Sequence, residues 1–306
     1  MYHFVRELEY TRYPKIKARK LGEFKNQLDH LENNYEFVTV EDCIEAVYGT
    51  NELPEDAVLL TFDDGYKDHY EKVFPILERK NIQGCFFPPA KAILEKEVLD
   101  VNKIHLILAI NEEKDNIEGL LDEVLLLLDK YRKEYSLKSN KEYYSKLAIE
   151  NRYDPEEIIF IKRLLQRELP ESARKKMVDE LFKKYLDVEE KVVSNELYMN
   201  MEQLRCMHRN GMHIGSHGYD HHWLNSISHE KLKNEIDLSQ DFLRDVGTPK
   251  NQWTFCYPYG AYNDEICRLL KKNGFKLGFT TEPKIANLDK KSAMVLPRLD
   301  TNEIPY

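Results

Sequence analysis

The stretch VLLTFDDGY, residues 58–66, decides how this chain is interpreted. An apolar run typical of a buried strand ends in two adjacent carboxylates and a glycine. Neighbouring like charges at the end of a buried strand raise each other's pKa and cost desolvation free energy, unless a cation or several hydrogen-bond donors compensate them. A metal ion is the simplest compensation, so we expect one beside Asp63 and Asp64.

A second polar stretch supplies imidazoles. The segment GMHIGSHGYDHH, residues 211–222, contains His217 and His221, which one turn of helix would place on the same side. One carboxylate and two imidazoles make a three-ligand site with a coordination position left for water. That arrangement is typical of catalytic zinc centres, whereas structural zinc sites are closed. The second aspartate is then a candidate general base.

The composition is that of an ordinary globular protein. Of the 306 residues, 42% are hydrophobic and 32% are charged, which provides enough apolar material for a sizeable core. The formal net charge of −9 argues against nucleic acid as a partner, because such binding depends on Lys and Arg. Five cysteines without a Cys-x-x-Cys pair indicate neither a disulfide framework nor a thiolate zinc site.

Targeting and membrane signals are not recognisable in the sequence. After Met1 no basic stretch precedes an apolar run, and no apolar window reaches the roughly 18 residues that a membrane span needs. We therefore expect a cytoplasmic protein with no membrane span.

Short apolar segments alternate with amphipathic ones in both outer parts of the chain, as in parallel α/β sheets. Helices are expected over residues 21–34, 40–48, 68–80, 229–246 and 263–273, and strands over 58–62, 82–87, 213–215, 253–257, 276–280 and 294–299. An α/β barrel accounts for both parts together, and its functional residues would follow the carboxyl ends of the strands.

The middle of the chain has a different composition. Residues 91–200 are densely charged, almost free of glycine and rich in Leu, Ile, Lys and Glu at helical spacing. We predict a discontinuous barrel over 1–90 and 201–306 with 91–200 as a helical insertion. The insertion would leave from the functional rim of the barrel, so it is a candidate lid or a subdomain for homo-oligomerisation.

Three motifs carry a resemblance to a known family. The segments TFDDG (61–65), SHGYDH (216–221) and YPYG (257–260) resemble, in order, the first three motifs of the polysaccharide deacetylases of carbohydrate esterase family 4. The third motif resembles the branch that deacetylates poly-N-acetylglucosamine. The resemblance implies a distorted (β/α) barrel that removes N-acetyl groups from sugars with a divalent metal.

The resemblance also implies roles for individual residues. Asp63 would be the general base, and Asp64, His217 and His221 would be the metal ligands. The backbone N–H at Tyr259, in the Pro-Tyr turn, would stabilise the oxyanion. Zinc is the expected cofactor, with cobalt or nickel as alternatives.

The chain departs from the family pattern at several positions. Gly218 stands where the family often has Ser or Thr, so a hydrogen bond of that loop is missing. Cys256 replaces an arginine that commonly orients the base, and its simplest interpretation is a small packing residue. Near the end of the chain, Arg298 is a candidate to orient Asp63 or the substrate, and Asp300 a candidate for a proton relay.

The usual general acid has no match, because neither the Asp-x-x-Asp-Trp motif nor the late Leu-x-His motif is visible. His3 and His69 are the remaining candidates for this role.

These observations predict a metal-dependent hydrolase that removes N-acetyl groups from an amino sugar, a glycan or a glycan precursor, with Asp63 activating a metal-bound water. Two alternatives stay open. The same metal and base would serve a deformylase or another C–N amide hydrolase. The altered motifs would also suit a non-catalytic carbohydrate-binding or assembly protein whose helical insertion docks to a partner.

Overall fold

The computed structural model describes residues 1–150 and 154–305 and divides the chain into two compact units. The barrel unit comprises Met1–Arg6, Ala18–Glu97 and Ser194–Tyr306. The helical unit comprises Glu7–Lys17 and Val98–Val193. The sequence pattern gave no indication that residues 7–17 belong with the helices, because this short segment lacks helical periodicity.

Parallel strands form the centre of the barrel unit. β3 (Leu60–Asp63), β4 (Gly84–Phe87) and β5 (His213–Ile214) make one sheet in that order. β6 (Thr254–Cys256) pairs with β7 (Leu277–Phe279). Parallel bridges at Ser216↔Phe255, Tyr2↔Phe62 and Phe279↔Leu296 join these pairs into one succession. This is the architecture of the distorted parallel barrel that the sequence predicts.

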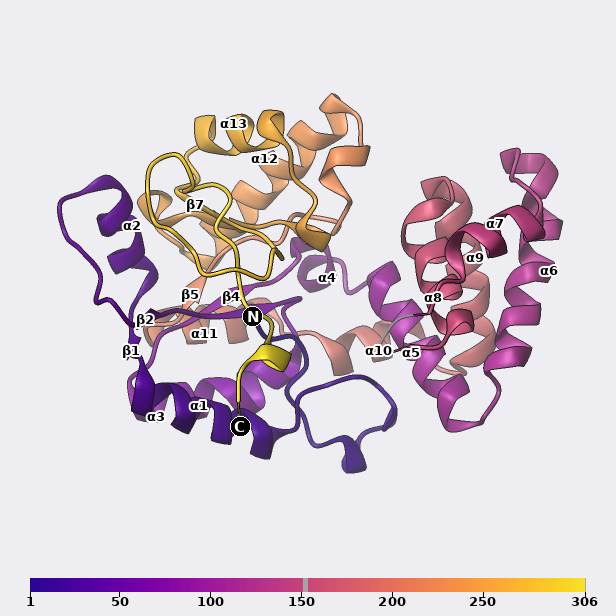
Figure 1. Cartoon of the computed structure of the whole chain (residues 1–306), viewed down its shortest axis with the longest axis horizontal. Coiled ribbons are helices and arrows are strands. Elements are labelled where there is room, and N and C mark those ends of the chain that lie inside the picture. The colour runs from indigo at the N-terminus through magenta and orange to yellow at the C-terminus, as the bar shows by residue number, and fades with distance from the viewer. Residues whose placement is uncertain (151–153, 306) are drawn as a thin grey trace. The chain divides into compact units, whose positions relative to one another are not determined.

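Helices cover the strands of this unit. Figure 1 shows α1 (Leu21–Asn34) and α3 (Phe74–Lys80) on one side of the strands, and α12 (His229–Val246) and α13 (Asp264–Lys272) on the other. The remaining elements of the unit are α2 (Val40–Tyr48), α4 (Ala90–Leu94), α11 (Met201–Arg209) and the short pair β1 (Glu36–Phe37) and β2 (Ala57–Val58).

Local signals explain why several predicted boundaries agree with the structure. α1, α2 and α12 begin and end at the predicted residues. Thr39 caps α2 by accepting the N–H of Asp42, and Ser228 caps α12 in the same way. α12 ends at Gly247, whose φ of +105° is the left-handed conformation that commonly terminates helices.

Three predicted elements differ from the structure. The strand expected over 58–62 is divided between β2 and β3, and the helix over 68–80 begins with a π-helical turn at His69–Val73. The strand predicted over 294–299 is wrong, because among the described residues this segment makes the single bridge at Leu296. Pro297, which has no N–H to give to a ladder, follows immediately.

Stacked aromatic rings support the start of the sheet. Phe62 of β3 lies between Tyr2 and Phe86, with ring centroids 5.1 and 4.8 Å away. All three side chains are fully buried. Because these large rings pack against one another, they fix the end of β3. The polar residues that follow Phe62 are therefore held in one place.

The helical unit is built from helices, as expected for the middle of the chain. They are α5 (Asp100–Glu113), α6 (Ile117–Tyr135), α7 (Asn140–Leu147), α8 (Glu156–Arg163), a π-helical turn (Leu164–Glu168) and α9 (Glu171–Tyr185), followed by α10 (Glu190–Leu197), which ends in the barrel unit. α5 is buried on most of its sides, whereas the other helices are largely amphipathic. α5 packs on α9, and most of the buried residues of the unit are apolar, for example Phe160 and Met177, although α5 also buries the cation Lys103.

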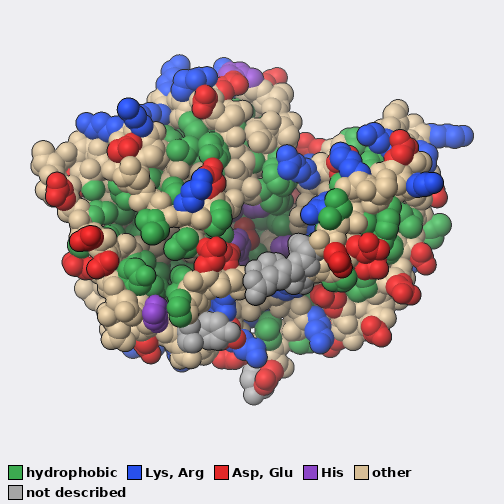
Figure 2. All heavy atoms as spheres, viewed as in Figure 1, with side chains coloured by type: hydrophobic (Ala, Val, Ile, Leu, Met, Phe, Trp, Pro, Cys, Tyr) green, Lys and Arg blue, Asp and Glu red, His purple; other side chains and the backbone are tan. Residues whose placement is uncertain are grey.

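The surface carries both signs of charge. On the face seen in Figure 2, acidic and basic side chains are interspersed over both units. Within residues 1–150 and 154–305, the helices are all too short or too polar to cross a bilayer.

Candidate active site

Asp64, His217 and His221 converge at the carboxyl ends of β3 and β5. Oδ1 of Asp64 lies 3.5 Å from Nε2 of each histidine, and the two Nε2 atoms are 3.2 Å apart. Three ligands around a tetrahedral zinc ion, each about 2.0–2.1 Å from the metal, would lie about 3.3 Å from one another. All three side chains are buried, so the donor set and its spacing fit a divalent metal ion.

The two histidines reach this position from a loop. His217 lies three residues beyond the end of β5, and no helix spans the segment to His221, so the expected helical turn is wrong. Two residues adopt left-handed backbone conformations instead, Gly218 with φ +75° and His221 with φ +51°. Positive φ in a non-glycine residue is uncommon and costs free energy, which the rest of the loop must offset.

Neighbouring groups orient two of the three candidate ligands. Nδ1 of His217 lies 2.8 Å from the carbonyl oxygen of Cys256, which can only accept, so this nitrogen carries the proton and Nε2 is left for a metal. The hydroxyl of Tyr66 donates to Oδ2 of Asp64 at 2.6 Å and leaves Oδ1 facing the imidazoles. Nδ1 of His221 is buried without a hydrogen-bond partner among the described residues.

Asp63, the candidate base, is held by an arginine from the far end of the chain. Nη1 and Nη2 of Arg298 donate to Oδ1 and Oδ2 of Asp63 at 2.8 and 2.7 Å. Nε of Arg298 donates to the carbonyl of Thr280 at 2.9 Å, which fixes the guanidinium plane. Burial alone would raise the pKa of Asp63, but the ion pair outweighs it and holds the pKa well below its usual range. Asp63 is therefore ionised at neutral pH.

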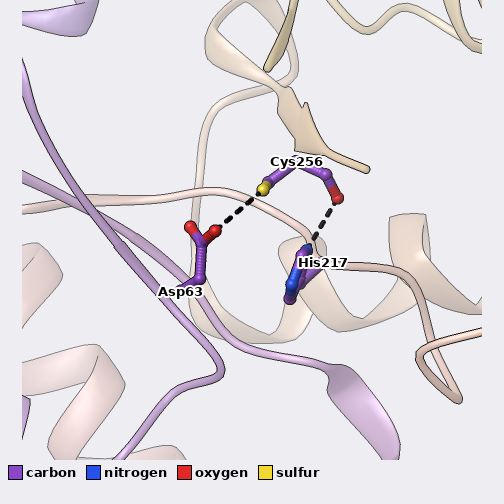
Figure 3. Close-up of side chains that lie close together, drawn as sticks. All are labelled: Asp63, His217 and Cys256. Atoms are coloured by element: carbon purple, nitrogen blue, oxygen red, sulfur yellow. Dashed lines mark hydrogen bonds between the residues drawn. The ribbon is translucent and has the colours of Figure 1, made fainter. Parts of the chain in front are cut away.

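Cys256 is part of the same cluster, so its interpretation as a packing residue was incomplete. Figure 3 shows its side chain directed at Asp63 and its carbonyl directed at His217. Sγ lies 3.4 Å from Oδ2 of Asp63 and 3.0 Å from Nη2 of Arg298. Burial raises the pKa of the thiol, so it stays protonated and donates to the carboxylate. Because Arg298 already neutralises the charge of Asp63, Asp64 is the carboxylate that remains to bind a metal ion.

Tyr259 lies beside the candidate ligands. It occupies the tight turn Pro258–Gly260 with a φ of +57°. Its ring meets His221 edge-on at 4.6 Å between centroids and stacks on Trp223 at 4.4 Å with an interplanar angle of 3°. The turn thus places the Tyr259 ring between His221 and Trp223, whereas the oxyanion role of its backbone N–H stays a prediction.

The other histidine and acid candidates are distributed differently. His69 is fully buried and donates from Nε2 to the carbonyl of His3, so it is not available to a substrate. Asp300 caps the short helix Thr301–Glu303 through Asn302, which gives it a local structural role. His3 is exposed and lies near Asp63 and Asp64. The general acid stays unassigned.

Three neighbours of the site were missed from sequence. Tyr66 and Trp223 each lie two residues after a candidate ligand, Asp64 and His221, and that proximity was the available signal. Glu235, whose carboxylate contacts the loop between the histidines, lies on α12 and gave no signal, because a single glutamate in a charged amphipathic helix is indistinguishable from a solvated one.

Comparisons with known proteins point to one family. The family model described as polysaccharide deacetylase matches residues 50–113 and 172–278, which is more than half of the chain. Over 47 residues the chain is 53% identical to a poly-beta-1,6-N-acetyl-D-glucosamine N-deacetylase of Escherichia coli (strain K12), covering 15% of this chain and 7% of that protein. A protein of the same name from Staphylococcus epidermidis is 31% identical over 100 residues, covering 30% of this chain and 34% of that one.

Solved structures share the fold. The Streptococcus pyogenes deacetylase PplD, in complex with acetate, superposes with a TM-score of 0.58 at 16% identity, covering 97% of this chain and 88% of that chain. IcaB from Ammonifex degensii gives a TM-score of 0.54 at 19% identity, with the same coverage of both chains. The predicted fold class is thereby confirmed. Since the family model matches more than half of the sequence, this chain belongs to the polysaccharide deacetylase family.

Proposed function

We propose that this protein is a metal-dependent hydrolase that removes N-acetyl groups from an amino sugar or glycan. The observation that carries the proposal is the pairing of two clusters at one rim, the ligand set Asp64, His217 and His221 and the ionised Asp63 held by Arg298. The named relatives deacetylate poly-β-1,6-N-acetylglucosamine, so oligomers of that polymer are the first substrates to test.

The residues divide the chemistry between them. A divalent ion, zinc with cobalt or nickel as alternatives, would supply Lewis acidity and lower the pKa of water at the site. Asp63 would accept a proton from the attacking water as it adds to the amide carbonyl carbon, and the backbone N–H of Tyr259 would donate to the carbonyl oxygen as it becomes negative. When the C–N bond breaks, the acetyl group leaves as acetate and the sugar nitrogen takes up a proton.

Arg298 acts through Asp63. Its two donors hold the carboxylate in one orientation and keep it ionised, so that it is ready to receive a proton. The thiol of Cys256 adds a third donor to the same carboxylate. These contacts are positioning interactions, because neither side chain needs to touch the substrate for them to act.

The test is release of acetate and formate from N-acylated amino sugars and poly-β-1,6-N-acetylglucosamine oligomers, with protein stripped of metal and then reloaded. Metal-dependent acetate release is expected. Formate release alone would replace the proposal with deformylation. Stoichiometric metal binding without release of either acid would overturn it in favour of a binding role.

The matched control for this assay is Asp63→Asn, which keeps the shape of the side chain and removes its basicity. We expect metal binding to be retained and kcat to fall by roughly 10²- to 10⁴-fold. Oligomerisation through the helical unit stays a prediction, and light scattering of the purified protein tests it.

A further inference from the structure

The loop that carries the two candidate histidine ligands is anchored through its backbone on one side by α4. The carbonyl oxygens of Gly218 and Tyr219 accept the N–H groups of Ala90 and Lys91 at 3.1 and 2.9 Å. Those two N–H groups belong to the first turn of α4, where they have no partner within the helix. The loop thus satisfies a helix end, and its carbonyls are fixed in return.

On the other side, a single carboxylate receives the next N–H groups of the loop. Oε2 of Glu235 accepts the N–H of Tyr219 at 2.9 Å and that of Asp220 at 3.2 Å, with Oε1 3.3 Å from the latter. Glu235 is only 3% exposed. A buried carboxylate is costly unless it is hydrogen-bonded, so the side chain and the loop stabilise each other.

Gly218 makes room for this carboxylate. A Cβ at this position would lie 3.3 Å from Oε2 of Glu235, and the φ of +75° disfavours any side chain. The N–H of Gly218 donates to the hydroxyl of Ser216 at 3.1 Å. The hydrogen bond that the sequence suggested was missing at Gly218 is therefore replaced by contacts from Ser216 and Glu235.

We infer that Glu235 is a positioning residue for metal binding, which fixes the backbone between His217 and His221 so that their Nε2 atoms stay at coordinating distance. The inference rests on the proposed function, because it assumes that these imidazoles bind a metal ion. His221 holds a positive φ next to the two anchored peptide groups, so loss of the anchor would let its ring turn away.

The experiment compares three variants by titration with zinc and cobalt and by the visible spectrum of the cobalt form. Glu235→Ala is expected to weaken metal affinity by roughly 10- to 100-fold, as loss of an outer contact to a ligand set commonly does. Glu235→Gln should recover most of it, because one amide oxygen can accept both N–H groups as Oε2 does. Asp237→Ala, an exposed acid on the same helix, is the control and should change nothing.

Hydrogen exchange of the metal-free protein separates positioning from general stability. In Glu235→Ala we expect faster exchange at Tyr219 and Asp220 with unchanged protection along α12. Unchanged metal affinity in Glu235→Ala would overturn the inference, and so would an affinity loss accompanied by equal loss of protection throughout α12. If the unaltered protein binds no metal, the proposed function fails first, which distinguishes the two results.

Discussion

The two units bury charge in different ways, and the difference shows where function is concentrated. In the barrel unit, Asp63, Asp64 and Arg298 are buried together with two histidines beyond the carboxyl ends of β3 and β5. In the helical unit, the buried cation Lys103 pairs with Asp179 and Glu190, whose side chains are 44% and 36% exposed. The buried charges of the barrel unit cost desolvation free energy unless a metal ion compensates Asp64. The charges of the helical unit form an ordinary ion pair that reaches solvent.

The largest effect is expected from His217→Ala. Removal of one of three ligands should abolish stoichiometric metal binding, and acetate release should fall to the level of the metal-free protein. Metal content after dialysis, measured alongside the release assay, checks this. A variant that keeps one equivalent of metal per chain would contradict the ligand assignment. The buried charges of the barrel unit would then no longer be explained by a metal site.

A smaller effect is expected from Arg298→Lys, which keeps the positive charge but loses the paired donors. Hydrogen bonds to charged groups contribute about 1.5–3 kcal/mol, so kcat/KM should fall by roughly ten- to a hundredfold. Because a weaker ion pair raises the pKa of Asp63, the acid limb of the pH profile should move to higher pH. Metal affinity should stay the same, and a profile that does not move would indicate that Arg298 does not act through Asp63.

Local and distant features of this site differ in how far the sequence could predict them. Asp63 and Asp64 could be predicted because two acids end an apolar run. The bounds of α2 and α12 could be predicted because the residues that cap these helices are adjacent to them in the sequence. The partner of Asp63 is 235 positions distant, so no local pattern connects Arg298 to it except its place near the end of a predicted strand. That segment is not a strand, yet its single bridge at Leu296 holds the backbone close enough for the guanidinium of Arg298 to reach Asp63.

The loop between the histidines shows the same limit in another form. The spacing predicts that His217 and His221 lie together, and they do. They are brought together by a loop, however, and not by the helical turn that the spacing suggested. Positive φ at Gly218 and His221 depends on partners from α4 and α12, which periodicity cannot identify. Cys256 likewise looks like packing until the fold places Asp63 beside it.

Acid should destabilise the barrel unit before the helical unit, because the barrel unit buries neutral histidines. Burial lowers the pKa of His213 to about 3 and that of His69 to about 4. The unfolded chain takes up these protons below about pH 6.5, while the folded protein does not. Their stabilisation is therefore complete above pH 6.5 and is lost on acidification, by about 1.4 kcal/mol per pH unit for each group.

Glu235 contributes with the opposite sign, because burial raises its pKa to about 7 and the folded state then binds the extra proton. The measurement is therefore the difference between the protein and His213→Gln in unfolding free energy at pH 6.5 and pH 5, together with hydrogen exchange in each unit. The helical unit has one histidine, His105, which is half-buried. Equal acid sensitivity in the variant would show that His213 is not the source.

The smallest effect is expected from Lys103→Met in the helical unit. The replacement fills a similar volume beside Phe182, whose ring lies 5.4 Å from Nζ of Lys103, and it leaves two carboxylates that water already reaches. Removal of one partner from a buried pair is damaging when the other charge is stranded, which is not the case here. We expect the free energy of unfolding to change by about 1 kcal/mol or less, with unchanged metal affinity and acetate release. A loss of activity at constant stability would mean that the charge of Lys103 serves the reaction. Function would then not be confined to the buried charges of the barrel unit.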